Sequence, residues 1–599
     1  MDTFREQILN ELKRHVAIEK IELEIPPKPE MGDYAFPCFS LAKIHKKNPN
    51  EIAKELSSKI GKNKNIEKVE ALGPYVNFFL NKKALREQTL NKILQEKDKY
   101  GSSNLGKGKK IILEHTSINP NASPHVGRAR NAIIGDAIAK ILRFQNYNVE
   151  VYYFVNDIGK QIAMLVLAAR GKKNPKFNDL LNLYINMSKK VEQNPALEKE
   201  VLEILFELEN NNKKVKSEFK KIVGISVKGQ IKILSELGIK YDVFDYESSY
   251  LWSRQTHEAL KLLEKTGRFF FDKDKRFVLD EKGFGLGMKM PLLVLTRGDG
   301  TSLYPLRDIA YALDMNKKGD CIVVLGEDQK LYNEQINAAL LILEKKTRKA
   351  VYYSFVLLED GKMSTRKGNF VLLEDFMKET LKKAEDGLQK RYKKINKKTA
   401  KSIAYGALKY SILKVSPEKN VIFNWEHALS FEGETAPYIQ YAYARISSII
   451  RHHKKDKKEM PKKADFSLLD KPEETELIKK LSLFPSIAEK AAVELRLNAI
   501  ATYTYELAKQ FNEFYHTYNI LKEGEELKKA RLLLAACVSQ TLKNSLNLLG
   551  IDVFRHRQSQ TGGLLAPFGR SVGFLRMRIF WVQTVLSNHQ SETGWNIRI

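Results

Sequence analysis

Apolar residues near the start of the chain recur with helical spacing, and charged residues fill the positions between them. The positions on this face are Phe4, Ile8, Leu12 and Val16. The pattern predicts an amphipathic first helix and not a secretory signal. From Ile66 to Leu80 it changes to that of two strands around a Gly73-Pro74 turn. We therefore expect an α+β N-terminal domain over residues 1–105.

A strand, a helix and a second strand follow in close succession. The first strand is expected at Lys110–Glu114, the helix at Ala129–Phe144 and the second strand at Val149–Val155. Two strands joined through a helix form a βαβ unit, which belongs to a parallel sheet. The same alternation returns between Pro291 and Phe376. These patterns predict a Rossmann-like parallel-sheet domain over residues 106–385.

Helical patterns dominate two further stretches. Residues 171–280 are mostly helical and charged, and we interpret them as an insertion into the sheet domain. From Thr380 to Gly550, apolar residues recur at i, i+3 and i+4, which predicts a helical domain over 386–555. Residues 556–599 contain no lysine, unlike the rest of the chain. We interpret them as a tail foreign to the fold; a specialised appendage is the alternative.

Length and composition restrict the class of protein. A chain of 599 residues is too long for one hydrophobic core, so several domains are expected. No run approaches the roughly 20 apolar residues that span a bilayer. The cysteines Cys38, Cys321 and Cys537 lie far apart without a CxxC pair, which indicates neither a disulfide framework nor a zinc site. We expect a cytoplasmic protein.

The formal net charge is +29, which predicts a polyanionic partner, most simply a nucleic acid. The alternative is a proteome rich in lysine, in which every protein is basic. Two lysine-rich stretches, Lys390–Lys401 and Lys454–Lys463, lie in or beside the predicted helical domain. They fit contact with an RNA backbone and equally fit solvated helix faces.

A glycine-containing turn joins the first predicted strand to its helix. It reads Pro124-His125-Val126-Gly127-Arg128. Such a turn presents backbone amides and the positive end of a helix dipole to a nucleotide phosphate. Gly127 permits close approach to the backbone, and His125 and Arg128 can donate hydrogen bonds to phosphate oxygens. Taken alone, the same residues also fit a loop histidine and a surface arginine.

A second segment concentrates cations and hydroxyls between glycines. It contains Lys362-Met363-Ser364-Thr365-Arg366, with Gly361 before it and Gly368 after it. Flanking glycines suit a loop that moves, and its cations suit a leaving pyrophosphate. Without the first segment it would be interpreted as a solvated basic turn.

In this order, the two segments resemble the ATP-handling motifs of class I aminoacyl-tRNA synthetases, named after HIGH and KMSKS. Other blocks resemble the arginyl-tRNA synthetase family, of the archaeal type, over nearly all of residues 1–555. These blocks are Gly32–Pro37 with Gly73–Phe78, Glu114–Asn121 with Arg130–Asp136, Val155–Gln161, Asp299–Ala310 and Phe431–Arg445. The resemblance implies an N-terminal domain that touches the tRNA, a Rossmann-like catalytic domain and a helical anticodon-binding domain.

The resemblance also implies roles for individual residues. Catalytic roles fall on His125, Arg128 and Lys362. ATP-binding roles fall on His125, Gly127, Arg128, Lys362, Met363, Ser364 and Arg366. The arginine pocket would consist of Glu114, Ser117, Asn119, Tyr304, Asp308 and Gln329. Carboxylates match the donors of a guanidinium, so Glu114 and Asp308 would divide between the guanidinium and the α-ammonium group. Asp308 also fits a helix N-cap and Glu114 a charge at a strand end.

The implied reaction has two steps. The carboxylate of L-arginine attacks the α-phosphate of Mg-ATP, which gives arginyl-adenylate and pyrophosphate. The 2′-OH of the terminal adenosine of tRNA(Arg) then takes the arginyl group, and AMP leaves. Family members generally bind tRNA before they activate arginine. Magnesium would arrive with ATP, so we expect no dedicated protein metal site and no tightly bound cofactor. A monomer without membrane contact is expected.

The chain departs from the family pattern at its end, where the sequence diverges from Asp552 onward, and at three places in or near the two motifs. Arg128 replaces the second histidine of the first motif, and Thr365 stands where the second motif usually has its later lysine. The lysine that often precedes the first motif is absent, since Ala122 and Ser123 occupy that stretch. Two alternatives stay open: a class I synthetase of another specificity, and an RNA-binding protein that kept the scaffold without full activity.

Overall fold

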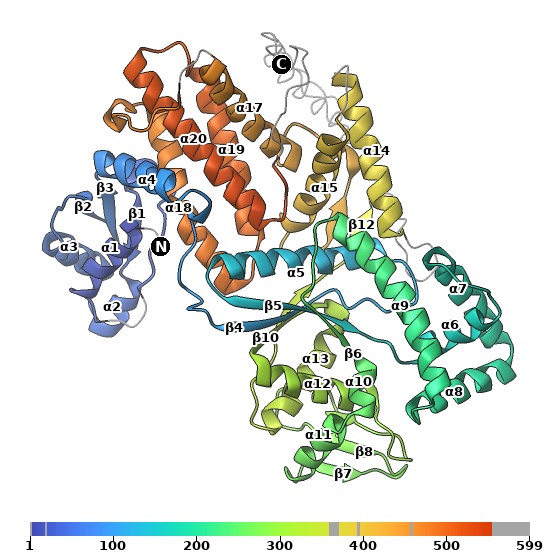
Figure 1. Cartoon of the computed structure of the whole chain (residues 1–599). Coiled ribbons are helices and arrows are strands. Elements are labelled where there is room, and N and C mark those ends of the chain that lie inside the picture. Colours follow the sequence, from blue (N-terminus) through green and yellow to red (C-terminus); the bar gives the residue numbers. More distant parts are fainter. Residues whose placement is uncertain (1–2, 18–20, 359–370, 392–395, 456–458, 554–599) are drawn as a thin grey trace, which may run out of the picture.

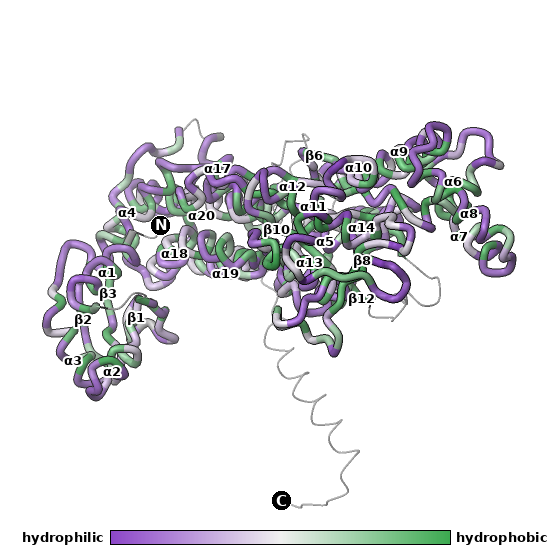
Figure 2. The backbone as a smooth tube through the Cα atoms, turned by 90° about the horizontal axis from the view of Figure 1, so that it is seen from below, coloured by the Kyte–Doolittle hydropathy of each residue, from purple (hydrophilic) through white to green (hydrophobic). Residues whose placement is uncertain are grey.

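The chain folds into an N-terminal unit, a parallel-sheet unit and a helical unit (Figure 1). The structure, a computed structural model, describes residues 3–17, 21–358, 371–391, 396–455 and 459–553. The second motif and residues 556–599 lie outside the described residues. The N-terminal unit and helices α6–α9 lie at opposite ends of the molecule, with the parallel sheet between them (Figure 2).

The N-terminal unit is a three-stranded antiparallel sheet with helices packed around it. Its elements are α1 (Thr3–Lys13), β1 (Tyr34–Pro37), α2 (Phe39–His45), α3 (Pro49–Lys59), β2 (Ile66–Leu72) and β3 (Tyr75–Leu80). The strand order is β1-β3-β2, and Gly73 makes the predicted turn at a φ of +60°. The four apolar residues of the first helical pattern are buried, as predicted. Helix α4 (Lys82–Glu96) leads out of this unit.

Five parallel strands form the central sheet, in the order β11-β10-β4-β5-β6. The strands are β4 (Lys110–Glu114), β5 (Asn148–Val155), β6 (Val243–Tyr246), β10 (Asp320–Gly326) and β11 (Lys349–Tyr353). The helices that connect and flank them are α5 (Val126–Phe144), α6 (Lys160–Arg170), α12 (Tyr304–Lys318) and α13 (Lys330–Ile342). The predicted βαβ unit and Rossmann-like fold are confirmed.

Alternate residues of each strand face two different hydrophobic cores. On β4, Ile111 and Leu113 belong to the core that contains α5, whereas Ile112 belongs to the core formed with α12 and α13. The sheet is therefore covered on both faces, as parallel sheets normally are. Figure 1 shows α5 on one side of the sheet and α12 and α13 on the other.

The stretch interpreted as a helical insertion, 171–280, is not helical throughout. Its first part forms α7 (Phe177–Gln193), α8 (Pro195–Glu209) and α9 (Lys213–Glu236). Beyond them, β6 pairs in parallel with β5 and so belongs to the central sheet. A strand of four residues that includes Asp245 carries too few apolar positions for a period to be recognised. The remaining elements are α10 (Glu247–Trp252), α11 (Gln255–Glu264), and an antiparallel sheet of β7 (Phe269–Phe271), β8 (Phe277–Asp280) and β9 (Leu292–Val294).

The last described third of the chain is helical, as predicted. Its helices are α14 (Leu373–Arg391), α15 (Lys397–Leu413), α16 (Trp425–Ala428), α17 (Ala436–Lys455), α18 (Pro472–Glu494), α19 (Asn498–Thr517) and α20 (Glu525–Leu548). Short parallel strands β12 (Val356–Leu358) and β13 (Val421–Phe423) pair beside them. Short 3-10 turns occur at Pro29–Met31, Lys97–Lys99, Glu327–Gln329 and Phe466–Leu468. Within the described part of the chain, no helix combines the length and the apolar character needed to cross a membrane.

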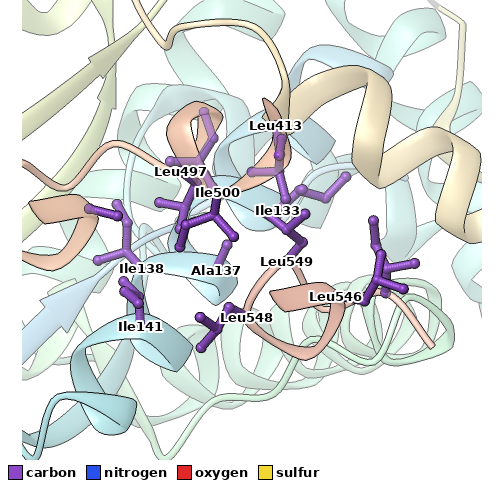
Figure 3. Close-up of a cluster of buried hydrophobic side chains, with 14 of the residues drawn as sticks. Ile133, Ala137, Ile138, Ile141, Leu413, Leu497, Ile500, Leu546, Leu548 and Leu549 are labelled. Atoms are coloured by element: carbon purple, nitrogen blue, oxygen red, sulfur yellow. The ribbon is translucent and has the colours of Figure 1, made fainter. Parts of the chain in front are cut away.

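The end of α20 packs against helix α5 of the parallel-sheet unit. Leu546, Leu548 and Leu549 meet Ile133 and other α5 side chains in one buried cluster (Figure 3). The ammonium group of Lys409, from α15, donates to the carbonyl of Gly550 at the same place. Helical and parallel-sheet units thus share a hydrophobic core instead of meeting through a polar interface.

Candidate active site

The predicted site residues that the structure describes lie near the carboxyl ends of the central strands. Strands β5 and β6 lie on one side of β4 in the sheet. Strands β10 and β11, which come later in the chain, lie on its other side. The order therefore reverses between β4 and β10, which is where open α/β sheets bind their ligands. Glu114 is the last residue of β4, and the first motif begins α5 ten residues later.

The first motif forms the N-terminal turn of α5. His125 is the N-cap residue, with extended backbone angles, and the Arg128 amide donates to its carbonyl at 2.9 Å. A Cβ atom on Gly127 would lie 3.0 Å from Nδ1 and Cε1 of the His125 ring, so the imidazole lies directly over the glycine. The amides and dipole of this turn favour an anion.

The His125 imidazole is neutral at pH 7. Burial and, to a smaller extent, the charge of the neighbouring Arg128 together lower its pKa to about 4. A neutral imidazole donates through one ring nitrogen only. The positive charge of the first motif therefore resides on Arg128 and on the helix dipole.

The segment that carries the second motif is attached to the first one. Strand β12 ends at Leu358, directly before this segment, which lies outside the described residues. Where the description resumes, Leu372 forms an antiparallel bridge with His125. Lys362, Met363, Ser364 and Arg366 lie outside the described residues, but the chain directly after their segment pairs with the turn that starts α5.

Arg130, on the next turn of α5, supports the site structurally, a role that the sequence did not indicate. Its side chain is fully buried and donates to five main-chain carbonyls at 2.7 to 3.2 Å. The acceptors are the carbonyls of Ser354, Phe355, Ser416, Pro417 and Lys419. These residues lead into β12 and β13, so one guanidinium joins α5 to the strand from which the second segment leaves. Nothing in the local sequence distinguishes this arginine from a surface one.

The turn after β4 holds Glu114 and Ser117 together. Ser117 Oγ donates to the Glu114 carboxylate at 3.0 Å. Thr116 and Ser117 have φ angles of +79° and +40°, which are strained for non-glycine residues. Asn131 of α5 supports this conformation: its side-chain oxygen accepts from the Thr116 amide at 2.6 Å, and its Nδ2 donates to the Val324 carbonyl at 2.8 Å.

Asp308 lies inside α12 and pairs with a side chain of the protein. Leu303 is the N-cap of that helix, so Asp308 is not. Arg348 Nη1 donates to Asp308 Oδ1 at 2.8 Å, and both side chains are buried. Burial raises the pKa of Glu114, Arg348 lowers it, and Asp308 raises it. Glu114, Asp308 and Arg348 therefore form one charged group of side chains.

The other predicted pocket residues make contacts of their own. Tyr304 begins α12 and stacks on Tyr332, with ring centroids 5.1 Å apart. Asn119 accepts from Asn156 Nδ2 at 3.2 Å, and Gln230 donates to its carbonyl at 3.0 Å. Gln329 is exposed on the turn after β10, where its amide donates to Asp328 at 3.1 Å.

The structure thus brings Glu114, Ser117, Tyr304 and Asp308 together, and it adds Arg348. Arg348 stands in the basic run Lys345–Lys349, where sequence gives no reason to place it inside the protein. Among the described residues, no group of three or more histidine, cysteine, aspartate or glutamate side chains is arranged to hold a metal ion.

Comparisons with known proteins identify the family to which the chain is similar. Residues 89–425 match the family model described as tRNA synthetases class I (R), catalytic domain. Residues 2–80 match the arginyl tRNA synthetase N terminal domain, and residues 439–556 match the DALR anticodon binding domain. The sheet order, the helix start at the switch point and these matches define a class I aminoacyl-tRNA synthetase.

Proteins similar to this chain in sequence and structure identify the family within this class. The arginine–tRNA ligase of Methanocaldococcus jannaschii is 38% identical over 569 residues, which cover 92% of this chain and 99% of that protein. That of Clostridium perfringens is 37% identical with the same coverage. The solved arginyl-tRNA synthetase of Thermus thermophilus has a TM-score of 0.80 at 27% identity, and covers 92% of this chain and 98% of its own. The chain belongs to the arginyl-tRNA synthetase family.

Proposed function

We propose that this protein ligates L-arginine to tRNA(Arg), with arginyl-adenylate as the intermediate and AMP and pyrophosphate as products. The observation that carries this proposal is the position of Glu114. Its partly buried carboxylate ends the strand that leads into the anion-binding turn of α5. A cationic amino acid bound there would present its own carboxylate towards that turn, where the α-phosphate of ATP is expected.

The chain's own residues would bind and orient Mg-ATP, which is a substrate. The amides of the α5 N-terminus, His125, Gly127 and Arg128 would receive the phosphates. Lys362 and Arg366, with Met363 and Ser364 beside them, would neutralise charge on the departing pyrophosphate. When arginine's carboxylate oxygen attacks the α-phosphorus, the bond to the bridging oxygen breaks and the electron pair leaves with pyrophosphate. Positioning and charge stabilisation suffice for this step.

In the proposed pocket, Glu114 pairs with the substrate's guanidinium, and Ser117 holds the carboxylate in place. Asn119, Tyr304, Asp308 and Gln329 are proposed to complete the pocket around the rest of the amino acid. A neutral side chain of similar size would leave the Glu114 carboxylate buried and unpaired. Such sites reject a wrong substrate strongly, so no separate editing site is required.

The partner for the second step is tRNA(Arg). We propose residues 1–105 as a tRNA-contacting domain, 106–385 as the catalytic domain and 386–555 as the anticodon-binding domain. The net charge of +29 supports binding to a polyanion. A cytoplasmic monomer is proposed, and residues 556–599 are proposed to be dispensable for the reaction.

Arginine-dependent ATP–pyrophosphate exchange, with and without tRNA(Arg), tests the proposal. The full chain and a variant ending at Val553 should both exchange with arginine alone among the amino acids, and only when tRNA is present. Lys362→Ala should abolish exchange without loss of arginine binding. Exchange with another amino acid would contradict the specificity, and no exchange in either chain would favour an RNA-binding protein without activity.

A further inference from the structure

A buried side chain of α9 holds the loop that joins β4 to α5. This loop, residues 115–124, contains no helix or strand and leads from Glu114 into the first motif. Gln230, on α9, donates through its Nε2 to the main-chain carbonyl of Asn119 at 3.0 Å and to that of Ala122 at 2.9 Å. Both acceptors are main-chain atoms, so the contact fixes the path of the loop itself.

Tyr153, on β5, completes this attachment. Its hydroxyl donates to Gln230 Oε1 at 2.9 Å and accepts from the main-chain amide of Ile118 at 3.2 Å. Tyr153 and Gln230 are both fully buried. The two N–H bonds and the oxygen of the Gln230 amide thus all have partners, as a stable buried polar network requires.

The position of Gln230 along α9 shows that packing alone does not account for it. The buried face of this helix carries apolar residues before and after it, including Val223, Val227 and Leu234. Gln230 stands in the same stripe, where an apolar side chain would be buried at no polar cost. A buried amide is unfavourable unless it is hydrogen-bonded, so its bonds to the loop are what stabilise it there.

The loop needs such support and carries residues of the site. Thr116 and Ser117 have positive φ angles, and strained conformations persist only where the surrounding structure determines them. Asn119 is a predicted pocket residue, and Ala122 lies two residues before the first motif. A displacement of about 1 Å at a reaction centre can lower the rate about 100-fold. The two carbonyls that Gln230 holds therefore lie where small movements matter.

We propose that Gln230 is a positioning residue, which holds the loop between β4 and the first motif in the geometry that adenylation requires. The inference rests on the proposed function and extends it to α9. Gln230 itself touches no substrate in this proposal. It acts through the main chain of Asn119 and Ala122.

Gln230→Met on the full chain, assayed by pyrophosphate exchange with tRNA(Arg), tests the proposal. Methionine has a similar length and stays buried, but it removes the hydrogen bonds to the loop and to Tyr153. Per folded molecule, we expect kcat to fall at least about tenfold and the KM for arginine to rise about tenfold. A loss of stability alone would lower the folded fraction and leave the KM unchanged. Unchanged kcat and KM per folded molecule would overturn the inference.

Gln145 provides a matched control at the other end of α5. It is also fully buried, and its Nε2 donates to the main-chain carbonyl of Gly101 at 3.0 Å. Gln145→Met should lower the unfolding temperature without altering kcat or the KM for arginine. If the two methionine variants change the kinetics equally, the effect is general and the inference is overturned. Should Gln230→Met fail to fold, Tyr153→Phe replaces it, with changes in the same direction.

Gln230→Glu tests whether a hydrogen-bond donor is what matters. A buried carboxyl group takes up a proton more readily, and the protonated form keeps one O–H donor for a carbonyl of the loop. At pH 6 this variant should therefore exchange several-fold faster than Gln230→Met. Equal rates would contradict the positioning role.

Hydrogen exchange of the loop amides gives a readout that does not depend on activity. In Gln230→Met the amides of residues 115–124 should exchange at least about tenfold faster than in the parent, and in Gln145→Met they should not. Unchanged protection of the loop would overturn the inference even in an active enzyme. A parent chain without arginine-dependent exchange would instead overturn the proposed function, so the two failures are distinguishable.

Discussion

The main-chain amide of Leu373 donates a hydrogen bond of 2.8 Å to the carbonyl of Pro124. The Val126 amide donates to the Val371 carbonyl at 3.1 Å, on the other side of the same short antiparallel pairing. The turn that begins α5 and the chain that follows the second motif are therefore joined by backbone. The junction uses backbone atoms and does not involve the side chains of the first motif.

Replacing Leu373 by proline should weaken ATP binding specifically. Leu373 is the first residue of α14, a position that accepts proline, so the main loss is the amide that bonds Pro124. Leu373→Ala removes the same buried side chain but keeps the amide, and is the matched control. We expect the KM for ATP of the proline variant to exceed that of the alanine variant by about tenfold, the value of one hydrogen bond. Equal values would show that the junction does not position the proposed ATP-binding residues.

Gly127→Ala should reduce adenylation by displacing His125. The new Cβ would stand 3.0 Å from the imidazole, closer than side-chain contacts usually allow. We expect the pyrophosphate exchange rate to fall at least about tenfold, since small displacements at a reaction centre are costly. Gly224 in α9 has open space around its Cα, so Gly224→Ala should stabilise the helix by about 0.5–1 kcal/mol and leave exchange unchanged.

Arg130→Lys should destabilise the protein by about 3 kcal/mol or more, because an ammonium group cannot reach five carbonyls arranged around a guanidinium. Denaturant unfolding measures the change. Arg170→Lys is the control. Arg170 pairs with Glu218 on the surface, at 2.8 Å, where the same substitution should cost at most about 0.5 kcal/mol. Similar losses at both sites would contradict the structural role of Arg130.

Glu281→Gln should stabilise the protein more at pH 8 than at pH 5. Burial raises the pKa of this carboxyl to about 7, above its value of 4.5 in water. At low pH the carboxyl is protonated in both folded and unfolded chains, so it costs nothing. As the pH rises from 4.5 to 7 the unfolded chain ionises while the folded carboxyl stays protonated, so stability falls through this window and levels off above it. The amide avoids this cost, and we expect a gain of about 1–3 kcal/mol at pH 8. An equal gain in the free energy of unfolding at pH 5 and pH 8 would contradict the raised pKa of Glu281.

Periodicity predicted the central strand–helix–strand unit almost to its ends, because strands buried on both faces and a long amphipathic helix give strong local patterns. It could not find β6, whose four residues owe their pairing to β5 and not to their own sequence. Helix α12 begins at Tyr304, so Asp308 lies inside it. The alternative that Asp308 is the N-cap of this helix is therefore wrong.

The candidate site was predictable only where motifs mark it. The first motif lies at the start of α5, as its glycine and its place after a strand indicated. The contacts of Arg130 and Arg348 link residues far apart in the sequence, and neither arginine stands in a pattern that distinguishes burial from exposure. A buried guanidinium is recognised by its acceptors, and these become neighbours only in the folded chain.

The buried cluster between α5 and the end of α20 determines when this part of the molecule can be completed during synthesis. Ile133 and Leu549 lie about 400 residues apart, so their contact forms only after nearly all of the described chain has left the ribosome. Until then, the part of the apolar face of α5 that Leu546, Leu548 and Leu549 contact lacks this cover. A chain whose synthesis stops before Leu546 would keep that face exposed to water and to other chains, which makes interrupted translation a source of aggregation for this protein.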